Sequence, residues 1–421
     1  MDALYFKGNT QMLVTTLRNF DNGYRLAKND IYNSIIADLQ QGGQTPPLQI
    51  HPALFNAYAD NLRKAITGVM GADARYFETS QRLQLNVTKF AAAKAYAVTQ
   101  ELVGARSARP DASPADFAKD AKRILNTYNR YQAAEYAAAV ARARTARQWA
   151  NFNNPNDIAN ELYPNIRWIP SRSVEPRPLH RKFWNQVWAK NDQFWNDNQP
   201  GNLWGCKCDW ERTDEPPTNL HLEPIKAEPG LKGNPGVTGE VFSKDASYFQ
   251  KVGTALLNQS ILSLPVKDTY IPFTDKINCN VLRDAKKVPK EVSVARNLIG
   301  AGYEKIYLLP ELHKKEAAQR AKFLPTGYKQ QDIKKNPDAV IVKDGKEYVA
   351  DFKVITNPSW LVRRIGESEG QAEYCVIKMD YDNKQDTHTI RIRVYDAMQN
   401  NPQIKGVIVL DKEGKIFYQT T

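Results

Sequence analysis

The spacing of apolar residues changes along this chain of 421 residues. Over roughly the first 150 residues, apolar side chains recur at three- and four-residue intervals, which is typical of amphipathic helices, and strand-like alternation is nearly absent. After about Lys286, short runs with strand character alternate with helical ones. The chain is therefore predicted to be multidomain, with an α-helical N-terminal region and a C-terminal α+β domain.

Individual elements follow from this periodicity and from turn residues. The predicted helices of the N-terminal region are Asn29–Gln41, Ala53–Val69, Leu85–Leu102 and Ala115–Trp149. The predicted C-terminal elements are helices Glu291–Ala301, Pro358–Ala372 and Ile392–Asn400, strands Tyr303–Leu309 and Tyr374–Met379, and two hairpins, Ala339–Val342 with Tyr348–Lys353 and Val407–Leu410 with Ile416–Gln419. The first hairpin turns at Asp344-Gly345, a strong turn signal. Arg142, Arg144 and Arg147 crowd the end of the last N-terminal helix, where they are expected to complement the helix dipole.

Tryptophan is concentrated in one short window. Seven of the eight tryptophans lie between Trp149 and Trp210, which indicates a compact, irregular α+β domain built on aromatic anchors. The segment Asp214–Gly236 then holds five prolines and three glycines, and predicts a connector without regular structure. The predicted division is a helical region at 1–148, the Trp/Cys-rich domain at 149–213, a connector and tail at 214–285, and the C-terminal domain at 286–421.

Charge and cysteine content limit the class of protein. A net charge of +12 favours acidic partners, nucleic acid first, although a solvated basic surface is an equal alternative. Four cysteines cannot form a disulfide framework, and Cys206 and Cys208 are too close to bridge easily, so a reducing cytoplasm is expected. The N-terminus lacks the features of a signal peptide and no apolar run is long enough to cross a membrane, so no membrane partner is predicted.

The Trp-rich window carries an ordered set of short motifs. They are a strand ending near Ser171, Arg177-Pro178 before His180, Asp192 before Phe194-Trp195, Pro200-Gly201-Asn202, and Gly205-Cys206-Lys207-Cys208. In this order they resemble the phage Mu F-like head-morphogenesis family, over about residues 70–250. The resemblance implies a phage or prophage minor capsid protein that acts in head assembly or DNA packaging, with portal and capsid proteins as partners. It would be found in the virion head and, during assembly, in the host bacterial cytoplasm.

The same window offers metal ligands. His180, Cys206 and Cys208 supply one imidazole and two thiolates, and Asp192 is a possible fourth ligand for tetrahedral zinc. The Cys-x-Cys spacing is tighter than that of the common zinc fingers. The alternative is two small buried cysteines and a hydrogen-bonded core histidine. A zinc ion bound here is expected to be structural rather than catalytic.

A second set of chemical groups lies on the predicted C-terminal hairpin. Asp338 follows Pro337 at the start of one strand, while Asp351 and Lys353 alternate on the other strand and therefore point to the same side. This arrangement resembles that of PD-(D/E)xK nucleases. The resemblance implies that carboxylates, with Glu291 completing the set, hold Mg²⁺ at a scissile phosphate while the lysine positions or activates water.

The order of elements in residues 286–421 is also similar to that of another family. Gly302-Tyr303, Leu309-Pro310-Glu311, Asn336-Pro337-Asp338 and Lys353 resemble positions in the Barnase/EndoU/colicin/RelE-type toxins of contact-dependent inhibition systems. These toxins imply metal-free, tRNase-like cleavage of RNA and a partner immunity protein. Asp351 or His388 would be the base, and Lys353 with Arg363, Arg364, Arg391 or Arg393 would stabilise the phosphorane. This interpretation is preferred because it accounts for more of the domain, which makes RNA a better candidate substrate than DNA.

Three functions fit the sequence. The first is a head-morphogenesis protein fused to a ribonuclease toxin. The second is a structural head protein whose C-terminal domain is inactive and binds a partner. The third is a free toxin or a metal-dependent DNA nuclease that only borrows the Mu F-like module.

Overall fold

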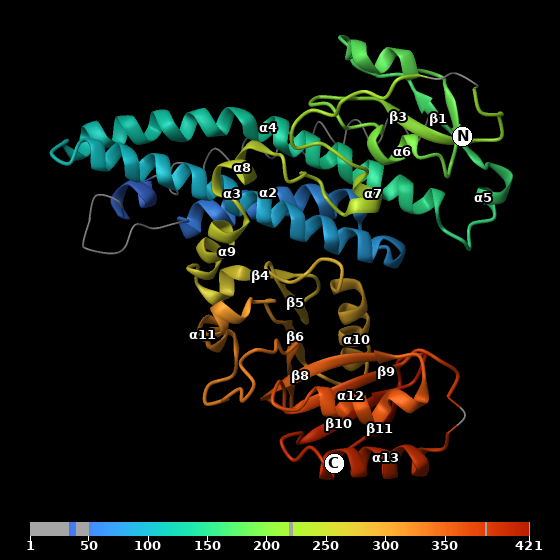
Figure 1. Cartoon of the computed structure of the whole chain (residues 1–421). Coiled ribbons are helices and arrows are strands. Elements are labelled where there is room, and N and C mark those ends of the chain that lie inside the picture. The colour runs from blue at the N-terminus through green and yellow to red at the C-terminus, as the bar shows by residue number, and fades with distance from the viewer. Residues whose placement is uncertain (1–32, 39–49, 219–221, 384, 421) are drawn as a thin grey trace.

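The computed structural model describes residues 33–38, 50–218, 222–383 and 385–420, and within them the protein is a mixed α+β structure. Long helices of the N-terminal region lie across the top of Figure 1, with a small sheet at one end of them. The C-terminal sheet lies below, with tail helices between the two layers. The predicted helical region and C-terminal α+β region are therefore both present.

Three long helices form the N-terminal layer. They are α2 (Pro52–Met70), α3 (Phe77–Ala108) and α4 (Pro114–Phe152), and they pack on one another in pairs. Alanines at the buried face of α3, among them Ala91, Ala92 and Ala95, allow the close approach. Of the predicted helix at Asn29–Gln41, residues 33–38 are helical and the remainder lies outside the described residues.

The arginines near the end of α4 have a structural role, but a different one from that expected. The helix continues to Phe152, so they do not lie in its last turn. Arg142 is fully buried and donates hydrogen bonds to four carbonyls of the tail, those of Leu231, Lys232, Gly233 and Glu240. Arg147 donates to the carbonyl of Val69 at the end of α2. These groups connect helices and tail by satisfying buried carbonyls.

The Trp-rich segment is a small antiparallel sheet with short helices. Its strands β1 (Asn165–Ile169), β2 (Val187–Ala189) and β3 (Asp209–Thr213) pair in the order β2-β1-β3, and helices α5 (Ala159–Leu162) and α6 (Phe194–Asp197) flank them. Trp168, Trp195 and Trp210 are almost completely buried in its core. The aromatic anchors expected from the sequence are thus the centre of this unit.

The predicted connector has two parts. Between β3 and α7 (Pro235–Thr238) the described residues contain no helix or strand, as the prolines predict. After it, α8 (Ser247–Val252) and α9 (Thr254–Leu262) pack on α3, and two further strands follow. The C-terminal sheet therefore begins before residue 286.

Eight strands form the C-terminal sheet, in the order β11-β10-β9-β8-β7-β6-β5-β4. The bounds are β4 (Tyr270–Pro272), β5 (Ile277–Asn280), β6 (Lys305–Leu308), β7 (Ala339–Lys343), β8 (Lys346–Ile355), β9 (Tyr374–Met379), β10 (Gly406–Leu410) and β11 (Ile416–Gln419). Strands β6, β7 and β8 form an antiparallel meander, whereas β8, β9 and β10 run parallel. The edge strand β4 and its neighbour β5 lie in the segment expected as connector, where their apolar residues extend the sheet.

Helices cover both faces of this sheet. Helix α10 (Val288–Gly300) lies on one face, while α12 (Leu361–Glu367) and α13 (Thr387–Gln399) lie on the other; α11 (Ala317–Arg320) belongs to a loop. Along β10, Val407 and Val409 join the cluster under α12 and α13, and Ile408 and Leu410 join the opposite one. The predicted helix Pro358–Ala372 is shorter in the structure, because the chain leaves α12 at Ser368.

A single buried cluster joins the layers. It runs from α2, α3 and α4 through α8 and α9 to β5, β6 and one face of the sheet. The C-terminal part therefore shares a core with the helices above it. Within the described residues, no helix has the length and apolarity needed to cross a membrane.

The contact of Arg142 with the tail can be tested by mutation. Arg142→Met keeps most of the side-chain volume but leaves four buried or partly buried carbonyls without their donor, so the free energy of unfolding is expected to fall by roughly 2–4 kcal/mol. Arg144 lies two residues away and is exposed, so Arg144→Met should change stability by less than about 0.5 kcal/mol. Urea unfolding of both full-length variants measures the difference, and equal losses would contradict the assigned role.

Candidate functional site

Asp338 enters the sheet immediately before β7. Its backbone N–H donates to the carbonyl of Ala350 (3.0 Å), and its own carbonyl accepts from the N–H of Leu309 (2.9 Å). The chain is thus fixed on both sides by β6 and β8. The side chain turns toward β8, where its Oδ2 accepts the N–H of Phe352 at 2.8 Å. The predicted hairpin is confirmed, with Asp344 and Gly345 at positive φ in its turn.

Asp351 and Lys353 point to the same face of β8, as the alternation predicts. The Lys353 Nζ lies 2.7 Å from Asp351 Oδ2. Asp351 is completely buried, whereas the side chain of Lys353 retains 20% of its exposure. Asp338 lies across from Asp351, because the adjacent residues Ala339 and Ala350 pair between β7 and β8 and the Asp338 N–H donates to the Ala350 carbonyl. The three predicted residues of the hairpin therefore form one group that reaches the surface at Lys353.

Two further residues that the sequence did not indicate complete this group. Ser368 Oγ donates to Asp351 Oδ2 at 2.6 Å, and Gln371 Nε2 donates to Asp351 Oδ1 at 2.8 Å. The same Gln371 nitrogen also contacts the carbonyl of Asn336, two residues before Asp338. Both residues follow α12, in a stretch predicted as ordinary helix. Their polarity was visible in the sequence, but the turn that directs them at Asp351 was not.

Glu291 is close to the group but is already paired. Both of its oxygens accept from Arg283, at 2.7 Å from Nε and 2.5 Å from Nη2. Arg283 Nη2 also donates to Asp338 Oδ1, and Nη1 donates to the carbonyl of Leu309 at 3.2 Å. Arg283 therefore stands between Glu291 and Asp338. The expected role of Glu291 as a ligand is not seen in this arrangement.

The pKa values of the two aspartates are shifted in opposite directions. Burial alone would raise the pKa of Asp338, but the Arg283 charge and several hydrogen bonds hold it below its usual value. Burial and the adjacent Asp338 raise the pKa of Asp351 to about 7, against the opposing effect of Lys353. Such opposite shifts are common when two acids lie close together in a buried site.

The other predicted catalytic residues lie elsewhere. His388 and Arg391 are exposed on α13, and neither has a described contact with Asp351 or Lys353. Arg363 and Arg364 are on α12, where both pair with Glu367 and lie over the ring of Trp360. Arg393 donates to Gln385. The alternative base His388 therefore has no described link to the group, because α13 presents that residue to solvent.

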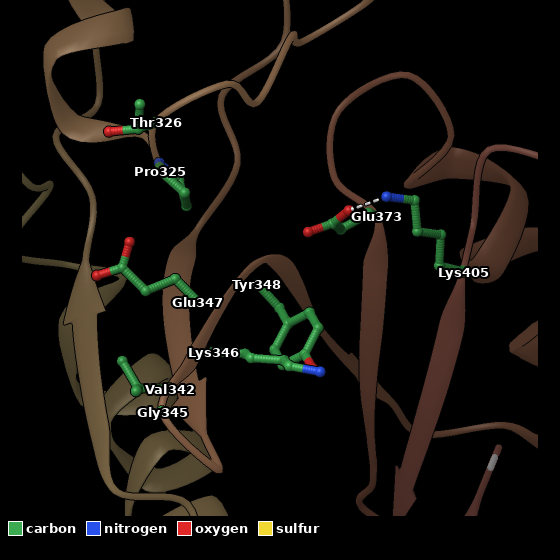
Figure 2. Close-up of a pocket in the computed structure, with 9 residues that line it drawn as sticks. All are labelled: Pro325, Thr326, Val342, Gly345, Lys346, Glu347, Tyr348, Glu373 and Lys405. Atoms are coloured by element: carbon green, nitrogen blue, oxygen red, sulfur yellow. Dashed lines mark hydrogen bonds and ion pairs between the residues drawn. The ribbon is translucent and has the colours of Figure 1, made fainter.

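An open pocket lies at the other end of β8 (Figure 2). Lys346, Tyr348 and the ion pair of Glu373 with Lys405, 2.7 Å apart, lie along its wall. None of the predicted catalytic residues lines it. We therefore place no chemistry in this pocket.

The Trp-rich unit holds a second group. His180, Cys206 and Cys208 place one nitrogen and two sulfurs within 4.8 Å of one another and could hold a metal ion. His180 Nδ1 lies 3.3 Å from the Cys206 sulfur and 3.6 Å from that of Cys208. A hydrogen bond between the thiols lowers the pKa of Cys208 to about 5, and the same contact with burial raises that of Cys206.

Asn202 fixes the orientation of the histidine. His180 Nε2 lies 2.8 Å from Asn202 Oδ1, while the Asn202 amide nitrogen donates to the carbonyl of Asp197 at 3.1 Å. Because the amide oxygen can only accept, Nε2 carries the proton and Nδ1 presents a lone pair to the sulfurs. Asp192 is not part of the group, because it is exposed and its Oδ1 accepts the N–H of Phe194 at 2.8 Å. All four cysteines of the chain are free thiols.

Comparison of the chain with protein-family models, with curated proteins and with solved structures finds no match. The resemblances to Mu F-like proteins and to nucleases therefore stay predictions.

The raised pKa of Asp351 has a consequence for stability. Its folded pKa of about 7 exceeds the unfolded value near 3.8, so the native state loses stability as pH rises through this window. Asp351→Asn removes this loss. In EDTA, the stability of the variant relative to the native chain should therefore improve between pH 5 and pH 8, by a few kcal/mol at most.

Thermal melting at the two pH values measures this change. Asp396→Asn is the matched control, because Asp396 is exposed on α13 and should show no such trend. A difference between native chain and Asp351→Asn that does not vary with pH would show that Asp351 is ionised throughout.

Proposed function

We propose that the C-terminal sheet carries a metal-dependent nuclease site, attached to a phage head-morphogenesis protein. The nuclease proposal rests on one observation: Asp338 and Asp351 lie across from each other on β7 and β8, next to Lys353. The sequence motif alone matches many unrelated hairpins. Its two acids and its lysine would not converge in most of them.

The donor set fits a hard divalent cation. Mg²⁺ binds proteins through one or two carboxylates and completes its coordination with water and substrate phosphate. Asp338 and Asp351 would hold the ion. When bound, such an ion polarises a phosphate and lowers the pKa of attacking water.

The remaining residues have roles that follow from their contacts. Ser368 and Gln371 hold both oxygens of Asp351, which fixes its orientation. Lys353 is partly exposed, and its ammonium can neutralise a phosphate oxygen or orient water at the mouth of the site. A chain of net charge +12 also attracts polyanions.

A metal-free ribonuclease is the second candidate. The observation in its favour is the Asp351 pKa of about 7, which suits a general base, next to the cationic Lys353. His388 and Arg391 do not support it, since neither has a described contact with this pair. The two candidates differ in their need for a divalent ion.

Cleavage assays separate these candidates. The full-length chain is incubated with total RNA and with plasmid DNA, in Mg²⁺ or in EDTA. We expect cleavage that EDTA abolishes, and a loss on the order of 100-fold or more in Lys353→Ala. Lys346→Ala should retain activity, because Lys346 is an exposed lysine on the same strand.

The alternatives predict other results. Cleavage of RNA that survives EDTA supports the metal-free ribonuclease. Absence of cleavage of both substrates supports a structural head protein with an inactive C-terminal domain.

For the Trp-rich unit we propose a structural zinc site. The imidazole and two sulfurs are ligands that zinc prefers, and the Asn202 contact is the kind of outer hydrogen bond that orients a ligating histidine. We place this unit in a minor head protein on the sequence resemblance alone. Detection of the chain in purified virions would test that assignment.

Zinc content tests the metal proposal. The native chain should purify with about one zinc per chain, and Cys206→Ala with Cys208→Ala should lose it. Asn202→Leu should weaken zinc affinity by roughly 10- to 100-fold, because His180 is no longer oriented. Asp192→Asn serves as the matched control and should keep the metal. Unchanged zinc in the double cysteine variant would contradict the site.

A further inference from the structure

Arg283 is a buried cation that the proposed nuclease chemistry does not use. It lies in the loop between β5 and α10, and its side chain is 1% exposed. Its guanidinium has partners on every side: both oxygens of Glu291, one oxygen of Asp338 and the carbonyl of Leu309. A buried guanidinium whose three nitrogens all donate hydrogen bonds is fixed in position.

This arrangement pairs Glu291 with Arg283 in a bidentate fashion. Both of its oxygens accept from Arg283, and the side chain is nearly buried. If Glu291 turned to bind a metal ion, the Arg283 charge would remain in the interior without its main partner, which is strongly unfavourable. Glu291 therefore serves to hold Arg283.

Arg283 in turn fixes Asp338. One oxygen of Asp338 accepts from Arg283 and the other accepts the N–H of Phe352 at 2.8 Å. The carboxylate cannot rotate without losing one of these bonds. Arg283 therefore fixes the orientation of a carboxylate that lies across from Asp351 on the neighbouring strand.

We infer that Arg283 is a positioning residue for Asp338, and that the site binds one divalent cation through Asp338 and Asp351. This inference rests on the proposed nuclease function. It differs from the expectation that Glu291 completes the ligand set.

The charge balance agrees with one ion. Glu291, Asp338 and Asp351 face two cations, Arg283 and Lys353, so the fully ionised group carries one net negative charge. One divalent ion converts this to a single positive charge, which balances one phosphodiester. A second ion would leave a large uncompensated positive charge in a largely buried site.

Metal binding, rather than cleavage, tests this. Mn²⁺ is titrated into the full-length chain by calorimetry, and Asp338→Asn identifies the binding that belongs to this site. We expect one Mn²⁺ per chain that Asp338→Asn abolishes. Glu291→Gln should still bind one Mn²⁺, with affinity reduced by roughly 10-fold, because its effect passes through Arg283.

A double variant controls for the effect of misfolding. Arg283→Met combined with Glu291→Gln removes both buried charges together, so neither is left alone. It should fold, bind one Mn²⁺ and show an affinity reduced by roughly 10- to 100-fold, because Asp338 is no longer fixed. Arg283→Lys should bind more tightly than this pair, because it keeps the positive charge.

Two results would overturn the inference while leaving the nuclease in place. They are two Mn²⁺ ions sensitive to Asp338→Asn in the native chain, or loss of all binding in Glu291→Gln. Absence of any Mn²⁺ binding sensitive to Asp338→Asn would instead overturn the metal-dependent function, and this inference with it.

Discussion

The antiparallel pairing of β7 with β8 is the constraint on which the C-terminal site depends. Ala339 pairs with Ala350 across it, which places Asp338 beside the start of the Asp351–Lys353 segment. Side chains alternate along a strand, so a slip of one residue would send Asp351 and Lys353 to the opposite face. The tight turn at Asp344 and Gly345, both at positive φ, fixes the register.

Buried basic groups recur at the joints of this protein. Arg142 connects α4 to the tail through carbonyls, Lys94 joins α3 to α4 through Glu135 at 2.5 Å, and Arg283 connects the β5–α10 loop to β7. Lys94 and Arg283 are paired with buried carboxylates, whereas Arg142 donates only to carbonyls. A buried charge without such partners would be very costly.

The buried core that runs from the helical layer to the sheet makes the two parts interdependent. Strands β4 and β5 follow directly on α9, which packs on α3, and Arg283 follows β5. The group of Asp338, Asp351 and Lys353 thus depends on a loop anchored near the helices. A fragment beginning at residue 286 would lose the edge strand β4, its neighbour β5 and Arg283.

Local patterns in the sequence determined much of this protein. Helical spacing identified α2, α3, α4 and α10, and Tyr374–Met379 and the hairpin at Asp344-Gly345 were predicted almost to the residue, because short-range periodicity and turn chemistry are encoded locally. The hairpin also brought the predicted residues Asp338, Asp351 and Lys353 to one place, while His180, Cys206 and Cys208, named from the sequence as possible ligands, form a group that could hold a metal ion.

Only the tertiary structure decided the partners of these residues. In the folded chain Glu291 pairs with Arg283, and Ser368 and Gln371 donate hydrogen bonds to Asp351. Asp192 and His388 are exposed, and β4 and β5 belong to the C-terminal sheet. Each of these outcomes depends on contacts between segments far apart in the chain. The partner of each buried carboxylate depends on how all the neighbouring buried charges and hydrogen-bonding groups are satisfied. Those neighbours come together only when the chain folds.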